Sequence, residues 1–139
     1  MFEATHSERS GIPASAVWAR WAKPARWPEW DARYANAELV GEGEFGEGSE
    51  IRVKMRKGGS TRQLVVALEP GKRLVTEYAL PGARVGHEHL VESRGPGSEV
   101  THRLYVDGPL SGLWAVMLSR KRLRETVATF SDAERPRRA

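Results

Sequence analysis

The chain has 139 residues, 40% of them hydrophobic and 29% charged, which is the size and composition of one globular domain with a full hydrophobic core. It contains no cysteine, so disulfides and thiolate chemistry are excluded, and no apolar run approaches the ~18 residues of a membrane-spanning helix. The net charge is +4, and no nucleic-acid-binding motif accompanies that excess of basic residues.

The first 30 residues predict a strand and two short helices. Residues 1–10 are polar and alternating, without the apolar segment of a signal peptide, so we expect a first strand and a cytoplasmic protein. Pro13 suits the first turn of a helix over residues 14–22, and Pro24 ends that helix. A second short helix contains Trp27 and Trp30. This tryptophan-rich segment is expected to close one end of the core, because such a cluster is too large to be solvated.

Residues 36–107 alternate between apolar and polar positions, with glycine- and proline-containing turns between the alternating runs. This pattern predicts an antiparallel meander with one apolar face, covered on one side only. The helices at the two ends of the chain must supply that cover. The expected strands are residues 36–40, 50–56, 62–69, 73–80, 85–93 and 99–107.

Side-chain alternation predicts which residues face the covered side of this sheet. If Glu69 points to water, the inward residues of its strand are Leu64, Val66 and Leu68. A turn centred on Pro96-Gly97 makes two of the inward histidines diagonal neighbours, and a slip of two residues makes them direct partners. The polar side chains that the alternation directs inward are Tyr78, His87, His89 and His102.

The stretch from Leu110 to Glu134 predicts the one long helix, around which the sheet is curved. Its apolar residues fall on a single stripe, made of Leu113, Val116, Met117, Leu123, Val127 and Phe130. The basic residues are interpreted as a solvated face and tail, with a weak anion-binding patch as the alternative. The basic residues of the helix lie mostly off the stripe, at Arg120, Lys121, Arg122 and Arg124, and those of the tail are Arg135, Arg137 and Arg138.

Five short motifs occur in an order that is similar to one known family. They are Pro13-Ala14 followed by Val17-Trp18, Trp27-Pro28-Glu29-Trp30-Asp31, Glu69-Pro70-Gly71-Lys72-Arg73-Leu74-Val75, Gly97-Ser98-Glu99-Val100-Thr101-His102, and Gly108-Pro109-Leu110. With the order of elements, they make nearly the whole chain resemble the START-like, or SRPBCC, superfamily, and within it the polyketide cyclase/dehydrase-like group. The resemblance implies a single START-like domain over residues 1–139 with an α+β helix-grip fold. In that fold a curved antiparallel sheet of about seven strands wraps around the C-terminal helix, and two short helices follow the first strand.

The resemblance also implies a deep, mostly apolar cavity between the long helix and the sheet, holding a small hydrophobic or aromatic molecule. We therefore expect a binding or carrier protein, monomeric or homodimeric, without cofactor, nucleic-acid partner or integral membrane association. Two alternatives stay open: a polyketide cyclase or aromatase that uses cavity histidines for proton transfer, and a protein-interaction module that uses the basic helix face. The residues expected to contact the ligand are Trp30, Met55, Val66, Leu68, Tyr78, His87, His89, His102, Leu113, Trp114 and Met117.

The inward histidines allow three interpretations. They can be hydrogen-bonded to each other, to Tyr78 or to water inside a partly wet cavity. They can instead orient a hydroxyl or carbonyl group of a ligand. Finally, they can move a proton, which makes His87, His89, His102 and Tyr78 the candidate catalytic residues. A His-x-His metal site would need a third ligand, so no metal is expected.

The entrance to the cavity is expected at two turns. By the resemblance, the turns at Gly58-Gly59 and Pro81-Gly82 flank it, and a mobile glycine turn could act as a gate there. An ordinary surface turn is the alternative at both places. Trp114 is interpreted either as a lid residue at this entrance or as part of the core.

Overall fold

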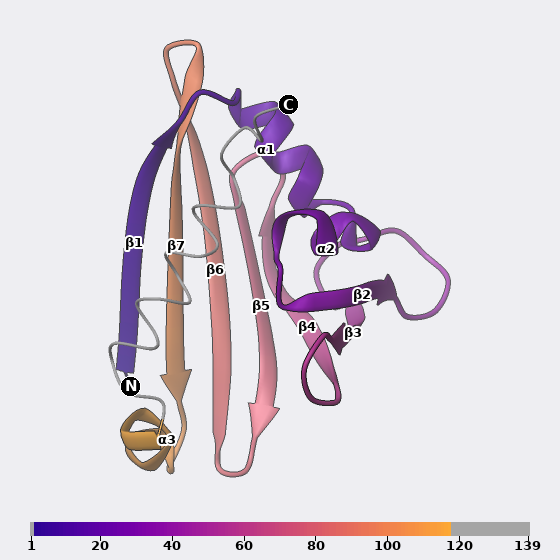
Figure 1. Cartoon of the computed structure of the whole chain (residues 1–139), viewed down its shortest axis with the longest axis vertical. Helices are drawn as coiled ribbons and strands as arrows, with labels where there is room; N and C mark the ends of the chain where they lie inside the picture. Colours follow the sequence, from indigo (N-terminus) through magenta and orange to yellow (C-terminus); the bar gives the residue numbers. More distant parts are fainter. Residues whose placement is uncertain (1, 118–139) are drawn as a thin grey trace.

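The computed structural model describes the backbone of residues 2–117 and the side chains of residues 2–114 (Figure 1). Its order of strands and helices is the order that the sequence predicts. The expected long helix is described only at its start, as α3, and its continuation to Glu134 lies outside the described residues. The elements are β1 (Phe2–Ser10), α1 (Ala14–Trp21), the 3₁₀ helix η1 (Pro24–Arg26), α2 (Trp27–Trp30), β2 (Tyr34–Leu39), β3 (Glu50–Met55), β4 (Ser60–Glu69), β5 (Arg73–Leu80), β6 (Ala83–Arg94), β7 (Gly97–Asp107) and α3 (Ser111–Met117).

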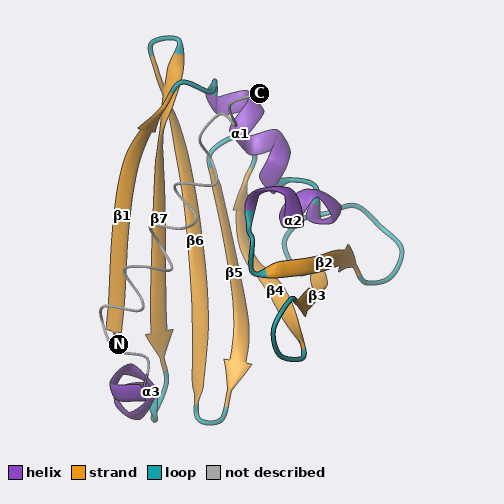
Figure 2. Ribbon diagram, in the orientation of Figure 1, coloured by secondary structure: helices purple, strands orange, loops and turns teal. Residues whose placement is uncertain are grey.

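One antiparallel sheet of seven strands forms the body of the protein, in the order β1-β7-β6-β5-β4-β3-β2. The first strand of the chain therefore lies beside the last, and the strands between them follow as a meander. Figure 2 shows α1 and α2 together at one end of the sheet, where α1 contacts β6 and β7 and α2 contacts β2. We call the side covered by α1 and α2 the inner face. This arrangement is the α+β helix-grip fold.

The tryptophan-rich segment forms the core between α1, α2 and the inner face, as the sequence predicts. Trp21, Trp27 and Trp30 are all buried, and they pack with aliphatic side chains of β3, β4 and β5. The indole Nε1 of Trp27 donates a hydrogen bond to the carbonyl oxygen of Trp21, 3.0 Å away, so this buried donor is satisfied. The cluster thus fastens both short helices to the same end of the sheet.

The predicted direction of the β4 side chains is wrong for two residues. Leu64 and Val66 are 46% and 39% exposed, whereas Gln63 and Val65 are buried on the inner face. The pairing of β4 with β5 shifts register between Val65 and Ala67, which marks a β-bulge. A bulge inserts one extra residue and exchanges the two faces of the strand beyond it. Counting back from Glu69 therefore assigns Val66 to the ligand side incorrectly.

Charged side chains form a ladder across the outer face of the sheet. Arg73 on β5 contacts Glu88 on β6 at 2.7 Å, and Arg103 on β7 contacts Glu3 on β1 at the same distance. Arg103 also lies 3.8 Å from Glu88, which joins the two pairs. The ring of Tyr105 lies over Gly86, where a Cβ atom would collide with it. The outer face is thus closed by long polar side chains, and the inner face is left for apolar contacts.

The bulge makes a matched pair of substitutions informative. Val65→Thr places an unpaired hydroxyl in the core and is expected to lower the free energy of unfolding by about 1–3 kcal/mol. Val66→Thr makes the same chemical change at an exposed position and should change the free energy of unfolding by less than about 0.5 kcal/mol. Urea denaturation of both variants measures the difference. Equal losses, or a larger loss for Val66→Thr, would contradict the observed direction of β4.

Candidate functional site

A row of histidines crosses three neighbouring strands on the inner face. His102 on β7 is the direct partner of His6 on β1 and of His89 on β6. The observed pairing of β6 with β7 is shifted by two residues from the one expected for a turn centred on Pro96-Gly97. His89 and His102 are therefore direct and not diagonal neighbours. Their ring centroids lie 4.7 Å apart at an angle of 75°, an edge-to-face contact. The sequence places these rings on the correct face, and the structure fixes their distance.

Two tryptophans cover the paired rings of His89 and His102. The ring centroid of Trp21 lies 5.3 Å from that of His89 and 5.9 Å from that of His102, in edge contacts. The ring centroid of Trp30 lies 5.7 Å from that of His89, also in an edge contact. Both histidines are buried. This pair is therefore enclosed within the aromatic core beneath α1 and α2.

His87 and Tyr78 continue the cluster away from the tryptophans. Their rings are stacked with centroids 5.9 Å apart, and the centroid of His87 lies 6.5 Å from that of His89. Tyr78 is only partly buried and packs against a second apolar cluster, which contains Val85 and Leu104. The pair formed by Tyr78 and His87 thus lies between the aromatic core and this second apolar surface.

The histidines of β6 and β7, His87, His89 and His102, are held in the neutral form at neutral pH. Burial lowers the pKa of His89 to about 3, and the positive charge of Arg33 acts in the same direction. Burial also lowers the pKa of His87, helped by Arg33 and His89, and that of His102, helped by the other histidines. A neutral imidazole has one donor and one acceptor nitrogen. The cluster can therefore exchange hydrogen bonds without carrying charge.

An ion pair that the sequence reasoning missed lies at the end of α2. The fully buried carboxylate of Asp31 accepts hydrogen bonds from Nε of Arg33 at 3.2 Å and from its Nη2 at 3.0 Å. The backbone N–H of Arg33 donates to the same carboxylate at 3.0 Å. The signal available in the sequence was an aspartate directly after a tryptophan-rich helix, with an arginine two residues later.

Tyr34 links this ion pair to the sheet. Its hydroxyl oxygen accepts a hydrogen bond from Nε2 of Gln63, 3.0 Å away on β4. Burial raises the pKa of Tyr34 to about 12, so the phenol is neutral. These side chains border a small hollow of about 10 Å³, which is room for one water molecule at most. The hollow is lined by Trp27, Trp30, Tyr34, Gln63, Leu74, Thr76, His87 and His89.

The remaining predicted ligand contacts divide into three groups. Trp30 borders the small hollow, while Met55 and Leu68 are partly buried against the aromatic core. Leu113, on α3, is 56% exposed. The side chain of Met117 lies outside the described part of the chain. The cavity was expected between the sheet and the long helix, and the predicted helix beyond Met117 lies outside the described residues.

Trp114 fastens the start of α3 to a turn that was predicted to flank the entrance. Its indole Nε1 donates a hydrogen bond to the carbonyl oxygen of Pro81 at 2.9 Å. The backbone N–H of Leu110 donates to the carbonyl oxygen of Gly82 at 2.9 Å. Gly82 has a positive φ of 71°, and a Cβ atom there would come within 2.5 Å of the Leu110 side chain. The Pro81-Gly82 turn is therefore attached to α3, and its role as a gate stays a prediction.

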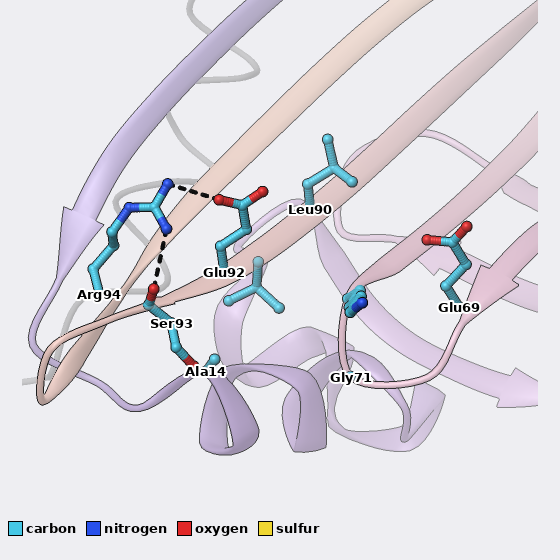
Figure 3. Close-up of a pocket in the computed structure, with 9 residues that line it drawn as sticks. Ala14, Glu69, Gly71, Leu90, Glu92, Ser93 and Arg94 are labelled. Carbon is cyan, nitrogen blue, oxygen red and sulfur yellow. Dashed lines mark hydrogen bonds and ion pairs between the residues drawn. The ribbon is translucent and has the colours of Figure 1, made fainter.

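A larger surface groove, of about 450 Å³, lies where α1 begins (Figure 3). It is bordered by Ala14, by the turn between β4 and β5, and by the end of β6. Arg94 in its wall donates hydrogen bonds to the Glu92 carboxylate at 2.7 Å and to the Ser93 carbonyl oxygen at 3.1 Å. This groove is open to the surface and carries four charged side chains, Glu69, Lys72, Glu92 and Arg94, so it differs from the deep, mostly apolar cavity that the resemblance implies. The inner face is therefore the candidate site.

Neither a metal-ligand cluster nor a membrane-spanning helix occurs among the described residues. Within the part of the chain that the structure describes, no group of three or more histidine, cysteine, aspartate or glutamate side chains could hold a metal ion. The described helices are all too short or too polar to span a membrane.

The chain matches one family over almost its whole length. The model of the family described as polyketide cyclase / dehydrase and lipid transport matches residues 1–133. No curated protein matches the chain significantly by sequence.

Solved structures share the fold at low sequence identity. Truncated norcoclaurine synthase from Thalictrum flavum matches with a TM-score of 0.71 and 12% identity, covering 95% of this chain and 89% of that one. A START superfamily protein from Mycobacterium smegmatis matches with a TM-score of 0.72 and 14% identity, and the match covers 94% of this chain and 92% of that one. BexL, the di-domain ARO/CYC of the BE-7585A biosynthetic pathway, matches with a TM-score of 0.75 and 19% identity, and the match covers 96% of this chain and 46% of that one. This chain thus spans less than half of BexL, and the likenesses show the fold alone.

The buried histidines make a prediction about pH. The pKa of His89 is about 3 in the folded state, against about 6.5 in the unfolded chain, so the unfolded state takes up protons first as the pH falls below 6.5. The free energy of unfolding should therefore fall by about 2 kcal/mol between pH 7 and pH 5 from this residue alone. Imidazole nitrogen chemical shifts, followed by NMR, should show His89 neutral throughout that range. A protonation midpoint between pH 6 and 7 would contradict its enclosure.

Proposed function

Because the chain belongs to the polyketide cyclase / dehydrase and lipid transport family, we propose that it binds one small hydrophobic or aromatic molecule on the inner face of its sheet, as a carrier or binding protein. The observation that supports this site is the stacked pair of Tyr78 and His87 beside the apolar cluster of Val85 and Leu104. Ligand sites are mostly apolar, with a few polar groups that fix orientation. The neutral imidazole and phenol would orient a hydroxyl or carbonyl group of the ligand.

Binding without catalysis agrees best with the state of the histidines. The rings of His89 and His102 contact each other and are covered by Trp21 and Trp30, so they do not converge on an open space. An efficient general acid or base has a pKa near the working pH. Burial holds the pKa of all three histidines well below that range. We therefore assign His89 and His102 to the framework of the site, and His87 with Tyr78 to ligand contact.

A polyketide cyclase or aromatase is the second candidate. It is favoured by the family description and by the proximity of Tyr78 to His87, which could pass a proton between a ligand and the protein. A cyclase would convert a poly-β-ketone chain as well as bind it, and His87→Gln would abolish that turnover. Under the carrier proposal the bound molecule is released unchanged.

The other expectations from the sequence stay predictions. They are a cytoplasmic location, a monomer or homodimer, and the absence of a nucleic-acid partner. The interaction module was assigned to the basic face of the long helix, and its residues, from Arg120 onward, lie outside the described residues.

The proposed site can be tested with a fluorescent apolar probe, N-phenyl-1-naphthylamine. His87→Trp places a larger ring on the inner face and should weaken binding of the probe about tenfold, which is ~1.4 kcal/mol. Leu90→Trp adds a large ring to the outer face of the same strand and should leave affinity within about a factor of two. Both affinities come from fluorescence titration, with circular dichroism to verify folding. Equal effects of the two variants would place the probe elsewhere.

A further inference from the structure

Arg33 is the one strongly held cation that we find beside the inner-face cluster among the described residues. The side chain of Arg33 is 34% exposed, while the side chain of Asp31, its ion-pair partner, is fully buried. Asp31 engages the edge formed by Nε and Nη2. Burial alone would lower the pKa of Arg33, but the hydrogen bond and charge of Asp31 outweigh it and raise that pKa. The guanidinium therefore stays charged and has a fixed direction.

The positive charge lies toward the predicted ligand contacts. The guanidinium carbon of Arg33 is 5.5 Å from the ring centroid of Tyr34, and Tyr34 borders the same small hollow as His87 and His89. The charge of Arg33 contributes to lowering the pKa of both histidines. It also opposes the increase in the pKa of Tyr78 that burial causes. One cation thus acts on side chains from β2, β5 and β6 together.

The polar side chains on which the charge of Arg33 acts are uncharged at neutral pH, apart from Asp31. A second arginine, Arg56, lies close by, and its Nε donates a hydrogen bond to the backbone carbonyl oxygen of Tyr34 at 3.2 Å. Tyr34 and Tyr78 are neutral phenols, because burial raises the pKa of each. His87 and His89 are neutral imidazoles, because burial lowers theirs. Asp31 offsets part of this charge, but the side chain of Arg33 keeps 34% of its surface in water, and a neutral apolar ligand would remove that water without replacing it, which is unfavourable. A ligand with a negative group would replace that solvation.

We propose that the ligand of this protein is a hydrophobic or aromatic acid, and that Arg33 receives its negatively charged oxygen group. This inference rests on the proposed function, and it narrows the ligand to molecules with a carboxylate or an ionised phenol or enol. Asp31 is the positioning residue, because it holds the guanidinium through two nitrogens. Tyr78 and His87 contact the body of the ligand.

Two probes that differ by a single acidic group test the proposal. N-Phenyl-1-naphthylamine is neutral, and 8-anilinonaphthalene-1-sulfonate is the same molecule with a sulfonate, which stands in for the ligand's acidic group. The native protein should bind the sulfonate at least about tenfold more tightly than the neutral probe. Binding of neither probe would overturn the proposed function itself. Equal binding of both would leave a hydrophobic site and overturn the role of Arg33.

Variants separate the effect of Arg33 from that of total charge. Arg33→Gln alone leaves Asp31 as an unpaired buried carboxylate and is expected to destabilise the fold. The double variant Asp31→Asn with Arg33→Gln removes both charges, and it should reduce the preference for the sulfonate to less than about twofold. Arg52→Gln is the matched control, because Arg52 is an exposed cation of β3 in a surface ion pair with Glu38. The proposal is overturned if Arg52→Gln reduces the preference as much as the double variant does.

Discussion

The pairing register of β6 with β7 determines what the inner face contains. Arg94 pairs with Gly97 across a two-residue turn, and this register puts His89 opposite His102. Only glycine fits at position 97, because a Cβ atom there would lie 2.2 Å from the carbonyl oxygen of Ser10. The hydroxyl of Ser98 donates a hydrogen bond to the carbonyl oxygen of Ile12 at 2.7 Å. A slip of one residue would exchange the two faces, so these contacts at the hairpin end hold the whole site in register.

The two faces of the sheet differ in the charge of their polar side chains. On the outer face, Glu88 lies between Arg73 and Arg103, and the ladder remains close to water. On the inner face, polar groups are kept neutral by burial, and the charge of Arg33 is held by one buried carboxylate. A neutral polar lining with one oriented cation suits the recognition of a small acid. The carrier proposal agrees with this lining, because efficient proton transfer needs groups that change charge near the working pH.

The alternation of the sequence was sufficient to predict the antiparallel meander and the inward direction of the histidines, whereas the pairing of β1 with β7 was not predicted from it. It was insufficient at β4, because a bulge between Val65 and Ala67 leaves no distinct composition and exchanges the faces of the strand. It also could not fix the distance between His89 and His102, which depends on the turn register. Asp31 and Arg33 were missed because they follow a short helix, where no periodicity predicts the direction of a side chain. The fold could therefore be predicted from the alternation of apolar and polar residues, whereas the geometry of the site depends on tertiary contacts that this alternation does not determine.

The most direct test of the proposed site is to locate a bound probe on the protein. Isotope-filtered NMR would record nuclear Overhauser contacts between N-phenyl-1-naphthylamine and the labelled protein. We predict contacts from the naphthalene ring to Tyr78, His87 and Leu104 on the inner face. Contacts confined to outer-face residues such as Val66 and Leu90, or to the groove beside Ala14, would contradict a ligand site on the inner face.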